Sequence, residues 1–415
     1  MNRLTIYKSL IANKVPLIKV PASKSISNRL LVLNAVFDNK LTIQNLSKSE
    51  DTLLLQSLLE QYSRNIHHFN CHNAGTVFRF LTAFLSFQPG IFYLTGSYAM
   101  KKRPIYPLVD AIKKIDSSIK ITYPEKYGFP PLEIRGTHVN QEIETNIDSS
   151  ISSQFITALL ITGIQKGVTL NIGNKPASYS YIQMTLMLLE KLGIQYHRYK
   201  NTLRIPAQQL QQQAIWVEYD WSSAAPWYVL TSIMHKGYSL QIDGLHKESI
   251  QGDTALNNLF NHLGVQTNYT GDSIVLHKTS DPPARALELD TTDIPDTVLY
   301  LLTACAANKI ELTLTGISHL RYKESDRIKA MQKELKKLGA ELDVTIKDTI
   351  KLHPAESINT KNDIIINPHG DHRIAMAFAP LAGIIDDLSI HDPDSVKKSY
   401  PNFWLEFQKC GFHIQ

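Results

Sequence analysis

The sequence has few of the residues and segments that mark secreted, membrane or metal-binding proteins. It contains only three cysteines, at positions 71, 305 and 410, and their wide spacing excludes a metal-thiolate or redox motif. The amino-terminal segment MNRLTIYKSLIANKVPLIKV has no unbroken apolar core and no small-residue cleavage site. The apolar stretch at residues 374–385 is too short to span a bilayer and contains Pro380. We therefore expect a cytoplasmic protein with reduced thiols, no metal site and no membrane partner.

An excess of charge of one sign is also missing. The 43 Lys and Arg residues and 38 Asp and Glu residues give a formal net charge of only +5, and no block of basic residues occurs. This balance argues against a nucleic-acid partner and fits small acidic substrates gathered at one basic site. The chain is 43% hydrophobic and 20% charged over 415 residues, which is typical of a globular protein with two domains.

Two kinds of helix-like segment alternate along the chain. Those of the first kind open with small or charged polar residues, become strongly apolar, and begin at positions 25, 76, 153, 223, 296 and 372. Those of the second kind are amphipathic and begin at positions 51, 103, 181, 253, 326 and 398. Short β-like runs such as LTIQNL and IELTLTG lie between them. A generic α/β protein with helices that recur by chance is the alternative, but six pairs in the same order favour an internal repeat.

The more apolar helices should be buried, with the amphipathic helices covering them. The first amide groups of a buried helix have no partner within the helix, and the helix dipole makes that end positive. If these helix starts converge, they form a site for anions. The polar residues at the starts favour this interpretation because several of them are cations.

The segment PASKSISNR places a lysine, a hydroxyl and a guanidinium near one helix start. Ser25 and Arg29 are four residues apart and share a helical face, while Lys24 precedes the first turn. This set suits a phosphate or carboxylate, although an ordinary capped helix is an equally good interpretation. In HNAGTVFR, Gly75 allows either a close approach of the backbone to a ligand or a tight turn, and Arg79 is interpreted equally well as a packing or surface residue.

In RYKESDR, Lys323 and Arg327 are expected to share a helical face. Glu324 then lies among cations, either as a proton-transfer group in a basic pocket or as part of a solvated helix start. Asp296, which follows Ile-Pro, is either a functional carboxylate or a helix cap.

In PHGDHR, Asp371 can cap a helix whose first turn holds His372 and Arg373. Positive side chains oppose the dipole at a helix start unless an anion binds there, so this conflict favours a functional site.

Together these motifs resemble the 5-enolpyruvylshikimate-3-phosphate (EPSP) synthase family. SKSxSxR, NAGTxxR, KRPI, SSQF, IPD, KESDR, DHR and a late lysine before Tyr-Pro occur in the family's order between positions 24 and 398. The resemblance implies an α/β fold, a two-lobed inside-out α/β barrel of six repeats of mixed strands and helices, three in each lobe. It places residues 21–219 in the first lobe and residues 1–20 with 220–415 in the second, and the lobes are expected to close on substrate.

The family transfers the enolpyruvyl group of phosphoenolpyruvate to the 5-hydroxyl of shikimate 3-phosphate, in the shikimate pathway to chorismate and the aromatic amino acids. The resemblance therefore implies a 3-phosphoshikimate 1-carboxyvinyltransferase with no cofactor, and a target of glyphosate. We expect a monomer because the sequence shows no heptad seam or interface stripe. One alternative is UDP-N-acetylglucosamine enolpyruvyl transferase, which typically carries a reactive cysteine just before its Arg-Pro motif, whereas residues 96–103 contain none. The other is a non-catalytic anion-binding protein on the same fold.

The resemblance also implies roles for single residues. Asp296 is expected to act as the base toward the hydroxyl and Glu324 as the proton shuttle at the methylene carbon, while Lys24 and Lys398 stabilise charge or share proton transfer. The residues implied to bind phosphoenolpyruvate are Lys24, Gly75, Arg103, Gln154, Arg327, Arg373 and Lys398. Those implied to bind shikimate 3-phosphate are Lys24, Ser25, Arg29, Ser152, Ser153, Gln154, Ser178, Tyr181, Asp296 and Lys323.

Overall fold

The fold was obtained as a computed structural model. It describes residues 3–8, 15–148, 150–174, 176–282, 284–358, 360 and 364–415. The chain divides into two compact units, and each is described by itself. Unit 1 comprises Met1–Ala22, Glu218–Arg321 and Ser325–Gln415, and unit 2 comprises Ser23–Val217 and Tyr322–Glu324.

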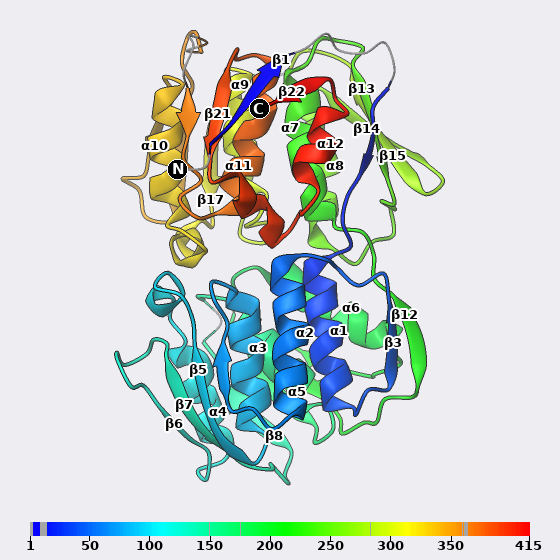
Figure 1. The fold of residues 1–415 in the computed structure, drawn as a ribbon, viewed down its shortest axis with the longest axis vertical. Helices are drawn as coiled ribbons and strands as arrows, with labels where there is room; N and C mark the ends of the chain where they lie inside the picture. Colours follow the sequence, from blue (N-terminus) through cyan, green and yellow to red (C-terminus); the bar gives the residue numbers. More distant parts are fainter. Residues whose placement is uncertain are drawn as a thin grey trace. The chain divides into compact units, whose positions relative to one another are not determined.

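Unit 2 contains three sheets among its described residues. Two have four strands, in the orders β4-β5-β7-β6 and β10-β11-β9-β8, and the third pairs β12 with β3 in parallel. The helices α1, α2 and α3 lie side by side (Figure 1). The helices are α1 Lys24–Val36, α2 Glu50–Ser63, α3 Gly75–Ser86, α4 Tyr106–Ile115, α5 Ser153–Gly163 and α6 Tyr179–Lys191. The strands are β3 Leu41–Gln44, β4 His68–Asn70, β5 Gly90–Thr95, β6 Lys120–Thr122, β7 Leu132–Gly136, β8 Ile143–Asn146, β9 Val168–Asn171, β10 His197–Tyr199, β11 Thr202–Ile205 and β12 Gln213–Trp216.

Unit 1 contains three four-stranded sheets among its described residues, in the orders β20-β21-β1-β22, β14-β15-β13-β2 and β16-β17-β19-β18. In the first of them β1 is antiparallel to both β21 and β22, so the first strand of the chain joins the last two. The helices are α7 Ala225–Ile233, α8 Leu256–Asn261, α9 Val298–Ala307, α10 Arg327–Lys337, α11 His372–Phe378 and α12 Phe403–Gln408. The strands are β1 Arg3–Lys8, β2 Leu17–Lys19, β13 Ser239–Asp243, β14 Val265–Thr270, β15 Ser273–Lys278, β16 Ala286–Asp290, β17 Glu311–Thr315, β18 Glu341–Asp343, β19 Thr349–His353, β20 Ile365–Ile366, β21 Leu388–His391 and β22 Phe412–Ile414.

The predicted division of helices into buried and covering kinds is confirmed. Every residue of α11 is buried, and α3, α5 and α9 are buried over almost their whole length. The amphipathic α10 buries Ile328, Met331 and Leu335 on one face, as its spacing predicts. Burial of entire helices forces their polar ends to find partners in the protein or a ligand.

All twelve predicted helical segments contain helix, with shifted bounds at several ends. Two segments begin as 3-10 turns, η2 Trp221–Ala224 before α7 and η3 Gly252–Ala255 before α8. The expectation that Lys323 and Arg327 share a helical face is wrong, because α10 begins at Arg327 with Asp326 as its cap. The segment Tyr322–Glu324 instead belongs to unit 2.

The mixed α/β class predicted from the sequence is therefore confirmed. Within the described part of the chain, every helix falls short of the length and apolarity that a bilayer crossing requires.

Gly264 offers a test of the packing in unit 1. Its φ is +73°, and a Cβ there would lie 2.1 Å from the carbonyl oxygen of Ser280. We expect Gly264→Ala to lower the free energy of unfolding by roughly 3 kcal/mol, because alanine meets both an unfavourable φ and a backbone clash. Gly237→Ala is the control: its φ is +92° and its Cβ would meet no atom within 4 Å. Urea unfolding of both variants measures the difference, and equal losses would contradict the predicted clash.

Candidate active site

The starts of α1, α3 and α5 lie together in unit 2. The three helices pack against one another in pairs, and the first turn of each lacks an acidic residue. Ser23 accepts a hydrogen bond from the amide of Ile26, and Ser152 accepts one from the amide of Gln154. The positive ends of three helix dipoles therefore converge without carboxylates in their own first turns, an arrangement that favours an anion.

Lys24, the first residue of α1, forms an ion pair with the neighbouring helix. Its amine lies 3.2 Å from Oδ2 of Asp51 in the first turn of α2. Both side chains are largely removed from solvent. Asp51 therefore fixes the position of the ammonium group.

Gln154 connects α5 to α3 through both ends of its amide. Its Oε1 accepts from Nη1 of Arg79 at 2.9 Å, and its Nε2 donates to the hydroxyl of Thr76 at 2.9 Å. These two bonds set the orientation of the amide and hold the guanidinium of Arg79 at the helix starts.

Two buried guanidinium groups flank Gly75. Arg79 is 2% exposed and Arg103 is 5% exposed, and a Cβ at Gly75 would lie 2.5 Å from Nη1 of each. Burial, and next the charge of Arg103, lowers the pKa of Arg79 well below its usual value, although Glu324 opposes the shift. Oε1 of Glu324 lies 3.9 Å from Nη1 of Arg103.

Several donors of this arginine pair remain available. Nε of Arg79 and both Nε and Nη1 of Arg103 are buried without a hydrogen-bond partner among the described residues. Because buried donors usually find acceptors, two adjacent cations with unused donors favour an anion beside Gly75.

The guanidinium group of Arg29 donates hydrogen bonds to other groups of the protein. Its Nε donates to the hydroxyl of Thr185 at 2.8 Å, its Nη1 donates to the carbonyl of Ser25 at 2.8 Å, and its Nη2 donates to the carbonyl of Tyr181 at 3.1 Å. Burial lowers the pKa of its guanidinium to about 10. Arg29 therefore ties α1 to α6 through the hydroxyl of Thr185 and the carbonyl of Tyr181.

The remaining expected residues of unit 2 lie at helix starts or in the preceding turn. Ser25 and Ser153 are in the first turns of α1 and α5, and Ser178 precedes α6 with a left-handed φ of 57°. Lys323 neighbours Glu324 in the segment that follows the 3-10 turn Ser318–Tyr322. The arginine pair Arg79 and Arg103 directly contacts Gly75, Gln154 and Glu324. Helix α6 is linked to α1 through Arg29 rather than through Ser178.

In unit 1, Asp296 lies between two guanidinium groups. Its Oδ1 is 2.9 Å from Nη1 of Arg327, and its Oδ2 is 2.7 Å from Nη2 of Arg373. Asp296 does not cap α9, whose N-cap is Thr297. The structure therefore does not make Asp296 the cap of α9, and the functional interpretation of its carboxylate stays a prediction.

Asp371 joins the starts of α10 and α11. Its Oδ2 accepts from Nε of Arg327 at 2.7 Å, and its Oδ1 accepts from the amide of Arg373 at 3.0 Å, which confirms the predicted cap. The charge conflict expected at Arg373 is resolved by Asp296, so an external anion is not needed to explain it. His372 is buried beside Asp371, and Lys398 is buried at the end of the 3-10 helix Pro393–Lys398.

Asp253 is a further buried carboxyl group, and it interacts electrostatically with Asp296 and Arg373. The hydroxyl of Thr297 donates to its Oδ1 at 3.5 Å. Burial, followed by the charges of Asp296 and Asp220, raises its pKa to about 7 although Arg373 acts in the opposite direction. The native protein thus binds a proton at Asp253 that the unfolded chain releases near pH 4.

Comparisons with known proteins assign the family. The family model described as EPSP synthase (3-phosphoshikimate 1-carboxyvinyltransferase) matches residues 60–407. A protein of Bacteroides fragilis named 3-phosphoshikimate 1-carboxyvinyltransferase is 36% identical over 401 residues, covering 96% of each chain. The chain belongs to the EPSP synthase family.

Further relatives extend this similarity. A protein of Buchnera aphidicola subsp. Cinara cedri with the same name as the Bacteroides protein is 34% identical over 420 residues, covering 94% of this chain and 93% of that one. A solved EPSP synthase from Acinetobacter baumannii superimposes with a TM-score of 0.74 over the full length of both chains, at 21% identity. The fold of this EPSP synthase family member is thus similar to that of a solved structure.

Three residues that the structure places at the site were not among those expected for an EPSP synthase. Arg79 lies in the NAGTxxR motif, and this motif was a sufficient signal to include it. Asp51 is 27 residues from Lys24, and Asp253 is 43 residues from Asp296, so local sequence does not pair them. Among the residues described, no group of three or more His, Cys, Asp and Glu side chains is arranged to hold a metal ion.

Asp253 predicts a pH-dependent stability for this EPSP synthase family member. Its folded pKa of about 7 lies above the unfolded value, so its contribution to stability is present below pH 4 and is lost as pH rises to 7. The pKa difference of about 3 is worth roughly 4 kcal/mol. We expect Asp253→Asn to remove this loss, so that the variant gains stability relative to the wild type between pH 5 and about pH 8. Urea unfolding of both proteins at both pH values measures the difference in their free energies of unfolding. A difference that is the same at both pH values would contradict the prediction.

Proposed function

We propose that this chain transfers the enolpyruvyl group of phosphoenolpyruvate to the 5-hydroxyl of shikimate 3-phosphate and releases phosphate. Relatives named for this activity match nearly the whole chain. The observation that carries the proposal is the pair of buried guanidinium groups, Arg79 and Arg103, beside Gly75 at the convergent starts of buried helices. Phosphate and carboxylate groups are the ligands that such donors bind.

The site residues form two sets, one for each substrate, and Lys24 and Gln154 belong to both. We assign to phosphoenolpyruvate the residues Lys24, Gly75, Arg103, Gln154, Arg327, Arg373 and Lys398. We assign to shikimate 3-phosphate the residues Lys24, Ser25, Arg29, Ser152, Ser153, Gln154, Ser178, Tyr181, Asp296 and Lys323. Arg79 is added to the first set as a residue that binds the anion or positions Gln154, because it donates to that amide.

Asp296 is proposed as the base that takes the proton of the 5-hydroxyl. In the described structure both of its oxygens are engaged by Arg327 and Arg373. An anionic substrate that binds these guanidinium groups competes with Asp296 for them. Substrate binding would thus release a carboxylate oxygen to act as base, and the base would become available only when the substrate is present.

Glu324 is proposed to donate a proton to the methylene carbon of phosphoenolpyruvate. The hydroxyl oxygen attacks C2 of phosphoenolpyruvate at the same time, giving a tetrahedral intermediate. The methyl group then returns a proton to Glu324 as phosphate leaves, which restores the double bond. The ion pair with Arg103 favours the ionised carboxylate of Glu324. A negatively charged substrate group that neutralises Arg103, together with the exclusion of water, would make the protonated form of Glu324 accessible. Lys24 and Lys398 stabilise the charge that develops.

The remaining expectations stand as parts of the proposal. They are a two-lobed inside-out barrel of six repeats, lobes of residues 21–219 and of residues 1–20 with 220–415, a cytoplasmic monomer, and catalysis without a cofactor. The three sheets that the described residues form in each unit support the repeat number.

Phosphate release from phosphoenolpyruvate tests the function directly. The purified chain is assayed with shikimate 3-phosphate or with UDP-N-acetylglucosamine as the acceptor. We expect release only with shikimate 3-phosphate. Release with the sugar nucleotide alone would assign the sister activity, and no release with either acceptor from folded protein would favour a binding protein.

Glu324→Gln tests the proton donor. The amide keeps the shape of the side chain but cannot donate the proton, so we expect kcat to fall by about 100-fold or more. KM for both substrates should change much less, because the amide still occupies the same space. Glu248→Gln, at an exposed position in unit 1, is the matched control and should retain full activity. Near-normal kcat in Glu324→Gln would exclude Glu324 as the donor.

Gly75→Ala tests the close approach at the arginine pair. The new methyl group would lie 2.5 Å from Nη1 of both Arg79 and Arg103 and must displace these side-chain ends. We expect KM for phosphoenolpyruvate to rise about ten-fold, the loss typical of one charge-assisted hydrogen bond. Gly193→Ala, whose Cβ would meet no atom within 4 Å, is the control. An unchanged KM in Gly75→Ala would show that the pair does not hold the anion there.

A further inference from the structure

Unit 2 contains a cavity at the other end of the helices that carry the candidate active site. It has a volume of about 380 Å³ and is lined by residues at or just beyond the carboxyl ends of α1, α2, α3 and α5. The lining is completed by residues 138–139 and by Ile143 at the start of β8. This volume lies near the lower limit of small-molecule pockets, roughly 300–1,000 Å³, so it suits a small metabolite.

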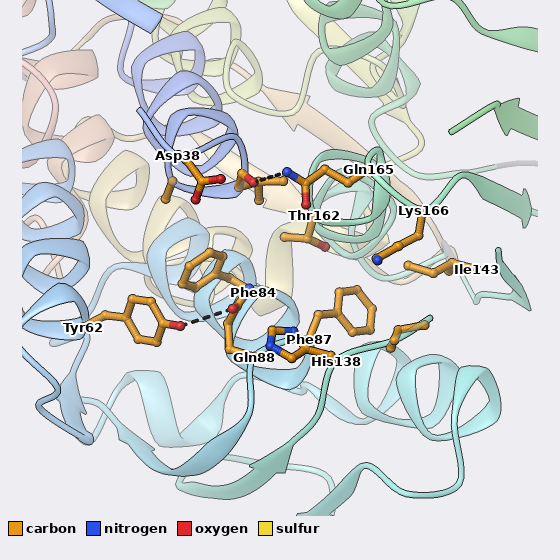
Figure 2. A pocket seen from close by; sticks show the side chains of 13 residues that line it. Asp38, Tyr62, Phe84, Phe87, Gln88, His138, Ile143, Thr162, Gln165 and Lys166 are labelled. Carbon is orange, nitrogen blue, oxygen red and sulfur yellow. Dashed lines mark hydrogen bonds between the residues drawn. The ribbon is translucent and has the colours of Figure 1, made fainter. Parts of the chain in front are cut away.

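One side of the cavity attracts positive charge. The last carbonyl groups of a helix have no partner within it, and the helix dipole makes that end negative. Gln165 donates to the carbonyl of Val36 at 2.7 Å, which places this amide among the helix ends. Asp38, two residues beyond α1, adds a carboxylate to the same side (Figure 2). An ammonium group fits this side.

The opposite side of the cavity attracts negative charge. Figure 2 shows Lys166 across the lined space from Asp38, with its amine directed toward Thr162 and Phe87. His138 lies below them in the same view and offers an imidazole nitrogen. Lys166, His138 and Asp38 are all exposed, so a ligand would meet them on entering.

Between the two charged sides lie apolar side chains that are largely buried and held in place. Phe84 and Phe87 are 2% and 8% exposed, and Ile143 is 1% exposed. Tyr62 packs edge-on against Phe84 with ring centroids 5.1 Å apart, and its hydroxyl donates to Oε1 of Gln88 at 3.2 Å. The bond and the ring contact fix these side chains, so the wall is formed before a ligand arrives.

We propose that this cavity binds a free α-amino acid with an apolar side chain. Its ammonium group contacts Asp38 and the carboxyl end of α1, its carboxylate contacts Lys166 and His138, and its side chain lies against Phe84, Phe87 and Ile143. A purely cationic ligand would be repelled by Lys166, and a purely anionic ligand would face Asp38 and the negative carboxyl end of α1. The zwitterion satisfies both sides.

Calorimetric titration of the full chain with L-phenylalanine tests the proposal. Phenethylamine, which lacks the carboxylate, and hydrocinnamate, which lacks the ammonium group, serve as matched probes. We expect phenylalanine to bind and each probe to bind at least about ten-fold more weakly, because each loses one set of charge-assisted hydrogen bonds. No binding of phenylalanine would overturn the proposal, and equal binding of either probe would overturn the assignment to a zwitterion.

Single substitutions locate the binding site. Lys166→Gln and Asp38→Asn should each weaken phenylalanine binding about ten-fold, and the second replacement keeps a residue that tolerates the positive φ of 52° at Asp38. Lys247→Gln and Glu248→Gln, at exposed positions in unit 1, should leave the affinity unchanged. Far-ultraviolet circular dichroism confirms that the variants fold. Phenylalanine binding that is unaffected by both cavity variants would place it elsewhere and overturn the proposal.

Discussion

The structure depends on how buried helices satisfy their amino-terminal ends. A helix buried over its whole length cannot expose its first amide groups to water, so other groups must neutralise its positive end. In unit 1 the protein supplies them itself, since Asp371 caps α11 and Asp296 pairs with Arg327 and Arg373. In unit 2 the first turns of α1, α3 and α5 lack acids, and two buried guanidinium groups add to the positive potential. One constraint thus gives a self-neutralised network in one unit and an anion-seeking site in the other.

Local patterns in the sequence predicted most of the helices of the fold. The apolar stretches beginning at positions 76, 153 and 296 are buried helices, because a run of apolar residues at helical length has few other stable locations. The face of α10 followed from the spacing of Ile328, Met331 and Leu335. The start of α10 did not follow from the sequence, because Asp326 caps the helix and the preceding residues Tyr322–Glu324 belong to unit 2.

The candidate site was less accessible to sequence reasoning for a physical reason. Motifs identify the chemical type of a side chain, whereas its partner is set by the packing of distant elements. Arg373 pairs with Asp296 across 77 residues, and Gln154 meets Arg79 across 75 residues. Neither distance is encoded in a local pattern. The charge conflict at Arg373 was therefore visible in the sequence, while its resolution by Asp296 required the fold.

The position of β1 has a consequence for the order in which the protein is made. β1 pairs with β21 and β22, and the backbones of Thr5 and Gln415 exchange two hydrogen bonds at 2.8 and 3.0 Å. A ribosome releases β1 long before it makes β21 and β22, so this sheet of unit 1 remains incomplete until those strands have been made. Almost all of unit 2, by contrast, is one continuous stretch, Ser23–Val217, which emerges early. Synthesis from the amino end thus gives unit 2 time to assemble while the strand that will close unit 1 waits for its partners.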